Sequence, residues 1–280
     1  MCEIPRNGLA IGFFDGVHRA HQAILSHAFR ALTFLNHRLT ILAPGKAPRL
    51  LMTTCDRLAA IRATGLNNIL ALNFTRELAN LSPDDFIKTY IHDQLIYCGE
   101  NWRFGRGGKG DGDYLRKKGF HVEIIPLIQV DGAPISSTRI RKALAQAQIK
   151  TVTELLGHPW SLRGILQKGK GLGHTLGFPT LNIQPSPELM LPPNGVYHVS
   201  LNGLDAIANL GLAPTCKEKA WTSPKLEVHL LANPGSFSAA VLPREGDNVE
   251  VVFRDFIRPE KKFATLKALK AQIAHDIASL

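Results

Sequence analysis

Near the start of this 280-residue chain, a short segment combines residue types that could handle phosphate. Asp15 and Gly16 follow an apolar run, and His18 and His21 come next, where a helical pattern begins. A helix places residues three apart on one face, and its free N–H groups at the start suit a phosphate. Two imidazoles there could donate hydrogen bonds as charge builds on a phosphate. Two solvated histidines are the structural alternative, and a zinc pair is disfavoured because no third ligand is evident nearby.

A second segment, residues 168–182, is rich in glycine and ends in a threonine and an asparagine. Thr180 and Asn182 are two apart, so an extended chain points both to one face, where their oxygens could hold Mg²⁺ and a terminal phosphate. The spacing is not that of a Walker A loop, and a glycine-rich hairpin loop is the structural alternative. Backbone N–H groups can approach phosphate closely at such glycines, which are Gly169, Gly171, Gly173 and Gly177.

Two further segments contain groups suited to anions or planar rings. Ser137, Thr138 and Arg139 stand at an expected helix start, where hydroxyls cap the helix and a guanidinium fork matches phosphate oxygens. A capped helix with surface arginines is the alternative. Asn101 lies among aromatic residues before a Gly/Arg loop that extends to Gly112. That loop could hold a planar ring, bind RNA or be simply mobile.

Composition narrows the class of protein. The net charge of +10 attracts anions, so phosphorylated metabolites, nucleic acids and acidic lipids all fit. No segment approaches the roughly 20 apolar residues of a membrane helix, and no secretory signal is evident, so we expect a cytoplasmic protein. The four cysteines are far apart and form no Cys-x-x-Cys pair, which excludes a zinc ribbon and disfavours a disulfide framework.

The elements that must position these residues fall into two groups. In the first half, strands alternate with helices, which predicts a parallel, doubly wound α/β sheet that binds ligands at the carboxyl ends of its strands. One helix is expected over 56–64, and another begins at Ser82, a capping residue followed by proline and two acids. The predicted strands are 9–14, 38–42, 69–74, 96–98 and 122–125.

Beyond Gly157 the pattern changes to short strands separated by glycine and proline, which predicts an antiparallel barrel. An amphipathic helix is expected at the end of the chain, with Phe263 and Ile277 on its apolar face. We therefore expect two domains, 1–156 and 157–280. The predicted strands of the second domain are 160–166, 195–201, 206–210, 226–231 and 248–253.

The motifs in residues 9–21, 99–105 and 135–141, in that order, resemble the N-terminal domain of bacterial bifunctional riboflavin kinase/FAD synthetase. The resemblance implies a Rossmann-like nucleotidyltransferase domain that transfers AMP from ATP to FMN and releases pyrophosphate without a covalent intermediate. It assigns residues to two parts of that site. The ATP and phosphate contacts would be Asp15, Gly16, His18, His21, Ser137, Thr138 and Arg139, and the flavin and nucleotide contact would be Asn101.

This domain departs from the family pattern at several positions. Phe13 stands where the family usually has Asn, and Ala20 where it has Gly. With a second strand at 38–42, the family's Phe-x-Pro-His-Pro segment would correspond to residues 42–48, which contain no histidine. These departures suggest the hypothesis that adenylyl transfer is slow or impaired.

The second domain resembles riboflavin kinase, whose signature is Gly-x-Gly-x-x-Leu-Gly-Phe-Pro-Thr-x-Asn. The resemblance implies a six-stranded antiparallel barrel that transfers a phosphoryl group from ATP to the ribityl hydroxyl of riboflavin. It assigns Glu227 as the base, Thr180 and Asn182 to Mg²⁺ and the γ-phosphate, and the glycine loop to the phosphates. From the residues alone, Glu227 is a solvent-facing strand residue between buried neighbours. The matching segments are 168–182, 194–197, 209–215, 226–230 and 257–263, while 238–242 departs from the family's Asp-Leu-Tyr-Gly.

Three functions follow from these observations. A bifunctional enzyme would use riboflavin, FMN and ATP with Mg²⁺, and would need neither a membrane nor a nucleic acid. A riboflavin kinase with an impaired first domain is the second. The third is a non-catalytic flavin- or RNA-binding regulator, which has no need of a positioned base. No oligomeric state is predicted.

Overall fold

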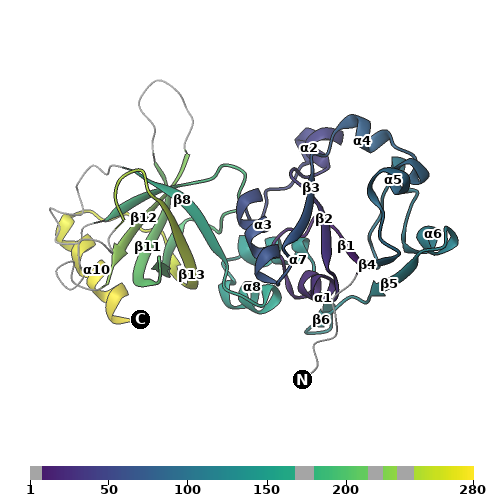
Figure 1. Ribbon diagram of the computed structural model, residues 1–280. Helices are drawn as coiled ribbons and strands as arrows, with labels where there is room; N and C mark the ends of the chain where they lie inside the picture. Colours follow the sequence, from purple (N-terminus) through teal and green to yellow (C-terminus); the bar gives the residue numbers. More distant parts are fainter. Residues whose placement is uncertain (1–7, 168–179, 214–222, 232–242) are drawn as a thin grey trace. The chain divides into compact units, whose positions relative to one another are not determined.

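The computed structural model describes residues 8–167, 180–213, 223–231 and 243–280 (Figure 1). The chain forms two compact units, Met1–Arg139 and Ile140–Leu280. The predicted boundary at 156/157 stays a prediction. Within the described ranges, no helix is both long and apolar enough to cross a membrane.

The first unit is built on a parallel five-stranded sheet, as predicted. The strand order is β3-β2-β1-β4-β5, so the direction of winding reverses beside β1. A doubly wound sheet binds ligands at this switch point, outside the carboxyl ends of the strands. The strands are β1 (Leu9–Ile11), β2 (Arg30–Phe34), β3 (Asn68–Leu72), β4 (Leu95–Gly99) and β5 (His121–Ile125).

Helices cover both faces of this sheet (Figure 1). Along β1, Leu9 and Ile11 belong to one apolar cluster and Ala10 belongs to another, so the strand is buried on both sides. The predicted cap at Ser82 is confirmed, because its Oγ accepts a hydrogen bond from the backbone N of Asp85 at 3.1 Å. The longer helices of this unit are α1 (Arg19–His27), α3 (Thr54–Ala63), α5 (Pro83–Tyr90) and α6 (Gly112–Lys117). The division between the two units falls within α7 (Ser137–Ala145).

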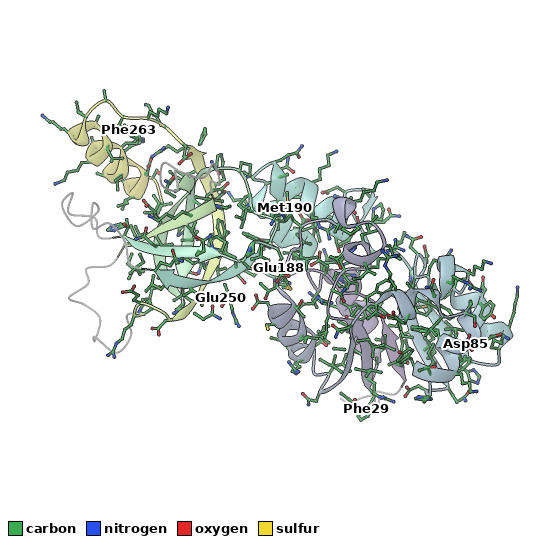
Figure 2. All side chains as sticks on the ribbon, turned by 90° about the horizontal axis from the view of Figure 1, so that it is seen from above. Phe29, Asp85, Glu188, Met190, Glu250 and Phe263 are labelled. Carbon is green, nitrogen blue, oxygen red and sulfur yellow. The ribbon has the colours of Figure 1, made fainter. Side chains whose placement is uncertain are left out.

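The prediction of the second strand was wrong. The strand is β2, Arg30–Phe34, whereas Leu39–Leu42 form the short helix α2. The apolar residues between 29 and 42 give no clear period, and a short apolar run cannot be assigned to strand or helix by periodicity alone. Phe29 lies between α1 and β2 and is 57% exposed, at the surface of the unit (Figure 2).

The second unit contains a closed six-stranded antiparallel barrel in the order β10-β11-β12-β9-β8-β13, which confirms the predicted fold. Its interior includes Trp160, Tyr197 and Phe253. The ring centroid of Phe253 lies 4.9 Å from that of Trp160 and 5.2 Å from that of Tyr197. The helix α8 (Ile149–Leu156) precedes the barrel. The strands are β8 (Ser161–Gln167), β9 (Leu181–Pro185), β10 (Gly195–Leu201), β11 (Leu204–Ala213), β12 (Ser223–Leu230) and β13 (Asn248–Pro259).

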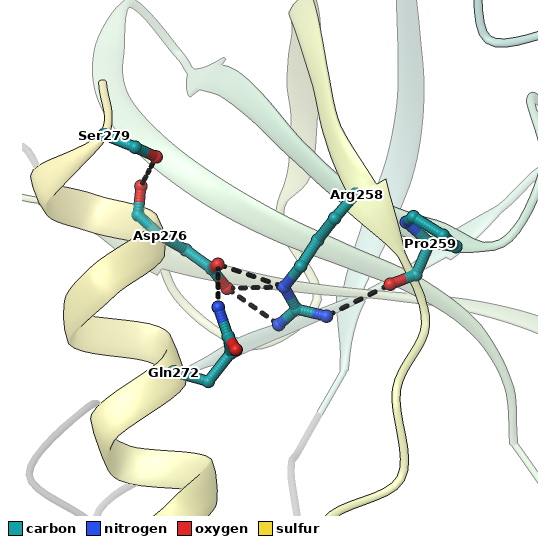
Figure 3. Close-up of polar contacts among 5 residues, drawn as sticks. All are labelled: Arg258, Pro259, Gln272, Asp276 and Ser279. Atoms are coloured by element: carbon teal, nitrogen blue, oxygen red, sulfur yellow. Dashed lines mark hydrogen bonds and ion pairs between the residues drawn. The ribbon is translucent and has the colours of Figure 1, made fainter.

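The predicted final helix is α10, Leu266–Ala278, and Phe263 lies just before it (Figure 2). A buried ion pair anchors this helix to the barrel (Figure 3). Arg258, at the end of β13, donates to both carboxylate oxygens of Asp276, at 3.0 Å from Nε to each and 2.7 Å from Nη2. Gln272 donates to the same carboxylate at 2.8 Å, and Asp276 is only 2% exposed.

We expect Asp276→Ala to lower the free energy of unfolding of the second unit by about 3–5 kcal/mol, because it leaves the Arg258 guanidinium without its carboxylate. The measurement is urea denaturation of the full chain. Lys150→Ala breaks the exposed Lys150–Asp255 pair and is the control, with an expected loss below about 1 kcal/mol. Equal losses in the two variants would contradict the prediction.

Candidate functional site

The first site begins at the turn between β1 and α1. Three of its residues have positive φ angles: Phe14 at 58°, Gly16 at 83° and Val17 at 41°. A β-branched residue such as Val17 rarely adopts this region, so the surrounding structure must enforce the turn. The backbone N of Leu51 donates to both carboxylate oxygens of the buried Asp15, at 3.0 and 3.3 Å. Asp15 thus braces the turn, and its predicted contact with ATP stays a prediction.

The structure brings the two histidines together at the start of α1. Their rings stack with centroids 3.5 Å apart, and Nδ1 of His18 accepts a 3.4 Å hydrogen bond from the backbone N of His21. Because His18 Nδ1 is an acceptor, the proton of its neutral ring lies on Nε2, which can donate to a ligand. The pKa of His21 is well below its usual 6.5, because burial and then the nearby His18 and Arg57 disfavour its charged form.

The third predicted segment reaches the same turn. Ser137 Oγ donates to the backbone oxygen of Asp15 at 2.9 Å, although the two residues are 122 positions apart. Thr138 is exposed. Arg139 donates from Nη1 to the backbone oxygens of Val130 and Ala133, at 2.9 and 2.7 Å. These bonds hold the hairpin of β6 (Gln129–Val130) and β7 (Ala133–Pro134), and phosphate binding by Arg139 stays a prediction.

A cavity of about 660 Å³ opens at the carboxyl side of the sheet. Phe13, at the end of β1, lines it together with the predicted Asn101. Rings supply much of its wall, and arginines line it too, so its chemistry suits a flat aromatic ligand that carries negative charge. The lining rings are Phe13, Phe34, His37, Phe74, Phe86, Trp102 and Phe104, and the arginines are Arg38, Arg103 and Arg106.

Sequence reasoning missed His37, because the second strand had been misplaced. The last residue of β2 and the four residues after it, 34–38, read Phe-Leu-Asn-His-Arg. It retains the phenylalanine and the histidine of Phe-x-Pro-His-Pro and replaces both prolines. Asn36 compensates by pairing its amide with the backbone of Phe74, donating at 3.0 Å and accepting at 2.8 Å. The expectation that this segment lacks a histidine is therefore corrected.

The barrel brings together the other predicted residues. Glu227 on β12 lies directly opposite Asn182 on β9 and Asn209 on β11. Directly opposed residues of antiparallel strands have Cβ atoms about 4.5–5.5 Å apart, so these side chains meet on one face. Leu226 and Val228 are fully buried, which places Glu227 on the outer face, as the alternation predicts. Its Oε1 accepts a 2.7 Å bond from Lys225 Nζ.

Asn182 is the distinctive member of this group. It is 4% exposed, and its Oδ1 has no hydrogen-bond partner among the residues that the structure describes. A buried amide oxygen without a partner is costly, so it indicates a position that a ligand completes. Thr180 is half-buried just before β9. The predicted phosphate glycines, Gly169, Gly171, Gly173 and Gly177, lie outside the described residues.

Three other kinase-like segments converge at one end of the barrel. Asn194 Nδ2 donates to Glu260 Oε2 at 3.5 Å. The carboxylate of Glu260 also packs against β11 at Gly211, where a Cβ atom would displace Glu260 Oε1. Lys225 lies opposite Gly211 in the register. Segments 194–197 and 257–263 and residues 209–213, the described part of the third segment, therefore meet beside the strands that hold Asn182 and Glu227.

Comparison with known proteins agrees with both units. Residues 3–139 match the family model of FAD synthetase, and residues 156–280 match that of riboflavin kinase. The chain is 34% identical to the bifunctional riboflavin kinase/FMN adenylyltransferase of Escherichia coli K12, over 99% of this chain and 93% of that protein. It is 32% identical to the enzyme of the same name from Bacillus subtilis, over 98% and 91%.

Among solved structures, a Streptococcus pneumoniae crystal structure described as a macrolide-efflux protein superposes with a TM-score of 0.83. That chain is 26% identical, and the match covers 98% of this chain and 93% of that one. Two domain models in the expected order and relatives matched along nearly their whole length lead to one conclusion: the chain belongs to the family of bifunctional riboflavin kinase/FMN adenylyltransferases.

Proposed function

We propose that this chain phosphorylates riboflavin in its second unit and transfers AMP from ATP to the resulting FMN in its first. The observation that carries the kinase half is the buried Oδ1 of Asn182, directly opposite Glu227. This oxygen has no hydrogen-bond partner within the described part of the chain. The Asn182 oxygen can bind a metal ion or a substrate, and the Glu227 carboxylate lies beside it on the same face of the barrel. Because ATP is the donor in both steps and Cys55 is a free exposed thiol, we place the protein in the cytoplasm.

In the kinase half, Glu227 accepts the proton of the terminal ribityl hydroxyl as that oxygen attacks the γ-phosphorus of ATP. The bond to the β–γ bridging oxygen breaks, and ADP leaves. The Lys225 ammonium, at 2.7 Å, holds the carboxylate of Glu227 in the free protein. This bond orients the carboxylate of Glu227, which lies on a strand and not in a loop.

Thr180 and Asn182 fit the binding of Mg²⁺, which prefers oxygen ligands and is commonly completed by substrate phosphates. The hydroxyl and the unpartnered amide oxygen supply two such donors. Among the described residues, no cluster of three or more His, Cys, Asp or Glu side chains offers a rival metal site. When bound, the ion would neutralise charge on the transferring phosphate.

In the adenylyltransferase half, the FMN phosphate attacks the α-phosphorus of ATP, and pyrophosphate leaves. The nucleophile is already an anion, so the protein needs to position the reactants and stabilise charge. His18 and His21 donate to the ATP phosphates from the start of α1. The 660 Å³ cavity takes the isoalloxazine ring, with Asn101 at its edge and the arginines near the FMN phosphate.

The departures from the family pattern do not remove this site. Phe13 forms part of the cavity wall, and His37 occupies the position of the family's histidine. The decisive experiment supplies riboflavin, ATP and Mg²⁺ to the full chain and separates the products. FMN and FAD together support the proposal, FMN alone supports an impaired first unit, and neither product supports a binding protein.

We expect Glu227→Gln to reduce FMN formation by about 10²–10⁴-fold, because the amide cannot accept the hydroxyl proton. The measurement is kcat for riboflavin phosphorylation at saturating ATP, with FAD formation from supplied FMN as an internal check on the other unit. Glu250→Gln, on the outer face of β13, is the matched control and should retain activity. Near-normal phosphorylation by Glu227→Gln would show that the base is elsewhere.

We also expect the chain to lose stability as the pH falls below 6.5. The folded state holds the pKa of His21 well below that value, so it binds fewer protons than the unfolded state there. The stabilisation is present above pH 6.5 and is lost towards the folded pKa, at no more than about 1.4 kcal/mol per pH unit. Urea denaturation between pH 8 and 5 measures it, and His21→Gln should flatten the dependence.

The control for the loss of one imidazole is His121→Gln, since His121 is exposed on β5. If both variants show the same pH dependence of the unfolding free energy, His21 is not its source.

A further inference from the structure

A buried arginine contacts the backbone beneath the cavity of the first unit. Arg57 lies in the first turn of α3 and is fully buried, with 0% exposure. Its guanidinium binds two strand ends. Nη1 donates to the backbone oxygen of Phe13 at 2.5 Å and to Thr33 Oγ1 at 3.1 Å. Nη2 donates to the backbone oxygens of Phe34 and Leu35, at 2.7 and 3.2 Å.

These bonds fix residues that line the cavity. The carbonyl of Phe13 follows β1, and those of Phe34 and Leu35 mark the end of β2. The Phe13 ring also covers the guanidinium, whose Cζ lies 4.1 Å from the ring centroid. The edge of that ring meets His37, with centroids 5.1 Å apart and planes at 79°. One side chain therefore sets the separation of two strand ends and the orientation of an aromatic wall.

Arg57 also acts on the phosphate-binding turn through its charge. It is one of the causes, after burial and His18, that hold the pKa of His21 well below the usual value. A neutral His21 retains a ring N–H donor and does not compete with His18 for charge in a stacked pair. Arg57 thus influences both the cavity proposed for the flavin ring and the histidine pair proposed for the ATP phosphates. It is not among the residues that line the cavity.

We propose that Arg57 is a positioning residue for adenylyl transfer, which orients Phe13 and His37 for FMN and sets the electrostatic environment of the histidine pair. The proposal rests on the proposed function of the first unit. It gives Phe13 a role as well: where the family has an amide, this chain places a ring that a buried cation holds in position. Arg57 would act through these residues and not by touching the reacting atoms.

The test measures kcat and KM for FMN and for ATP during FAD formation, between pH 5 and 8. Arg57→Met removes the fork and the charge, Arg57→Lys keeps a charge that cannot reach all four acceptors, and Phe13→Leu removes the ring alone. Arg62→Met, on the exposed side of the same helix, is the matched control. Phosphorylation of riboflavin by the same preparations calibrates the amount of active protein.

We expect Arg57→Met to raise KM for FMN at least about tenfold. The same change should raise the pKa of His21 and so move the acid-side loss of FAD formation to higher pH. Arg57→Lys should raise KM for FMN but keep the wild-type pH profile, because it keeps the charge. Phe13→Leu should share the KM effect without the pH shift. Arg62→Met should match the wild type.

Two results would overturn the proposal. A folded Arg57→Met with unchanged KM for FMN and an unchanged pH profile would show that the residue does not position the site. Loss of the first unit's unfolding transition in both Arg57 variants, with kinase activity intact, would reduce Arg57 to a purely structural role. If the wild type makes no FAD at all, the proposed function fails instead, independently of the variants.

Discussion

The turn after β1 depends on backbone conformations that most L-residues avoid, at Phe14 and Val17 as well as at Gly16. Phe14 and Val17 each cost on the order of 1–3 kcal/mol in this conformation, so neighbouring structure must offset that cost. The Asp15 carboxylate binds the backbone of Leu51, and Ser137 binds the backbone of Asp15, while the Phe14 and Val17 side chains are buried. The rest of the first site follows from this turn, because it delivers His18 to the start of α1.

The barrel solves the same positioning problem by register. Asn182 and Glu227 come from different segments of the chain, yet the antiparallel hydrogen bonds of β9 and β12 leave them no freedom in relative position. Beside them, the carboxylate of Glu260 packs against β11 at Gly211. The polar site of the first unit thus lies at the end of β1, whereas that of the second unit lies on the outer face of the barrel, on β9 and β12.

Features that depend on neighbouring residues in the sequence, such as helix caps and turns, could be predicted from it. Ser82 and its acids fixed a helix start, and glycine and proline spacing indicated the barrel. The sequence did not reveal β2, because an apolar strand buried on both faces has no alternation to read. With that strand misplaced, His37 was missed. Arg57 had no signal at all, since its partners are backbone oxygens contributed by residues 13, 34 and 35.

Asn36 illustrates how this chain differs from relatives that use proline in the same segment. Proline stiffens a chain covalently. The side-chain amide of Asn36 instead ties this segment of the cavity wall to the backbone of Phe74, with one donated and one accepted hydrogen bond. Its two hydrogen bonds with the backbone of Phe74 contribute about 1–3 kcal/mol together. Temperature and solvent act on hydrogen bonds and leave a pyrrolidine ring unchanged. The order of this segment should therefore depend on conditions in a way that a proline-stiffened segment would not.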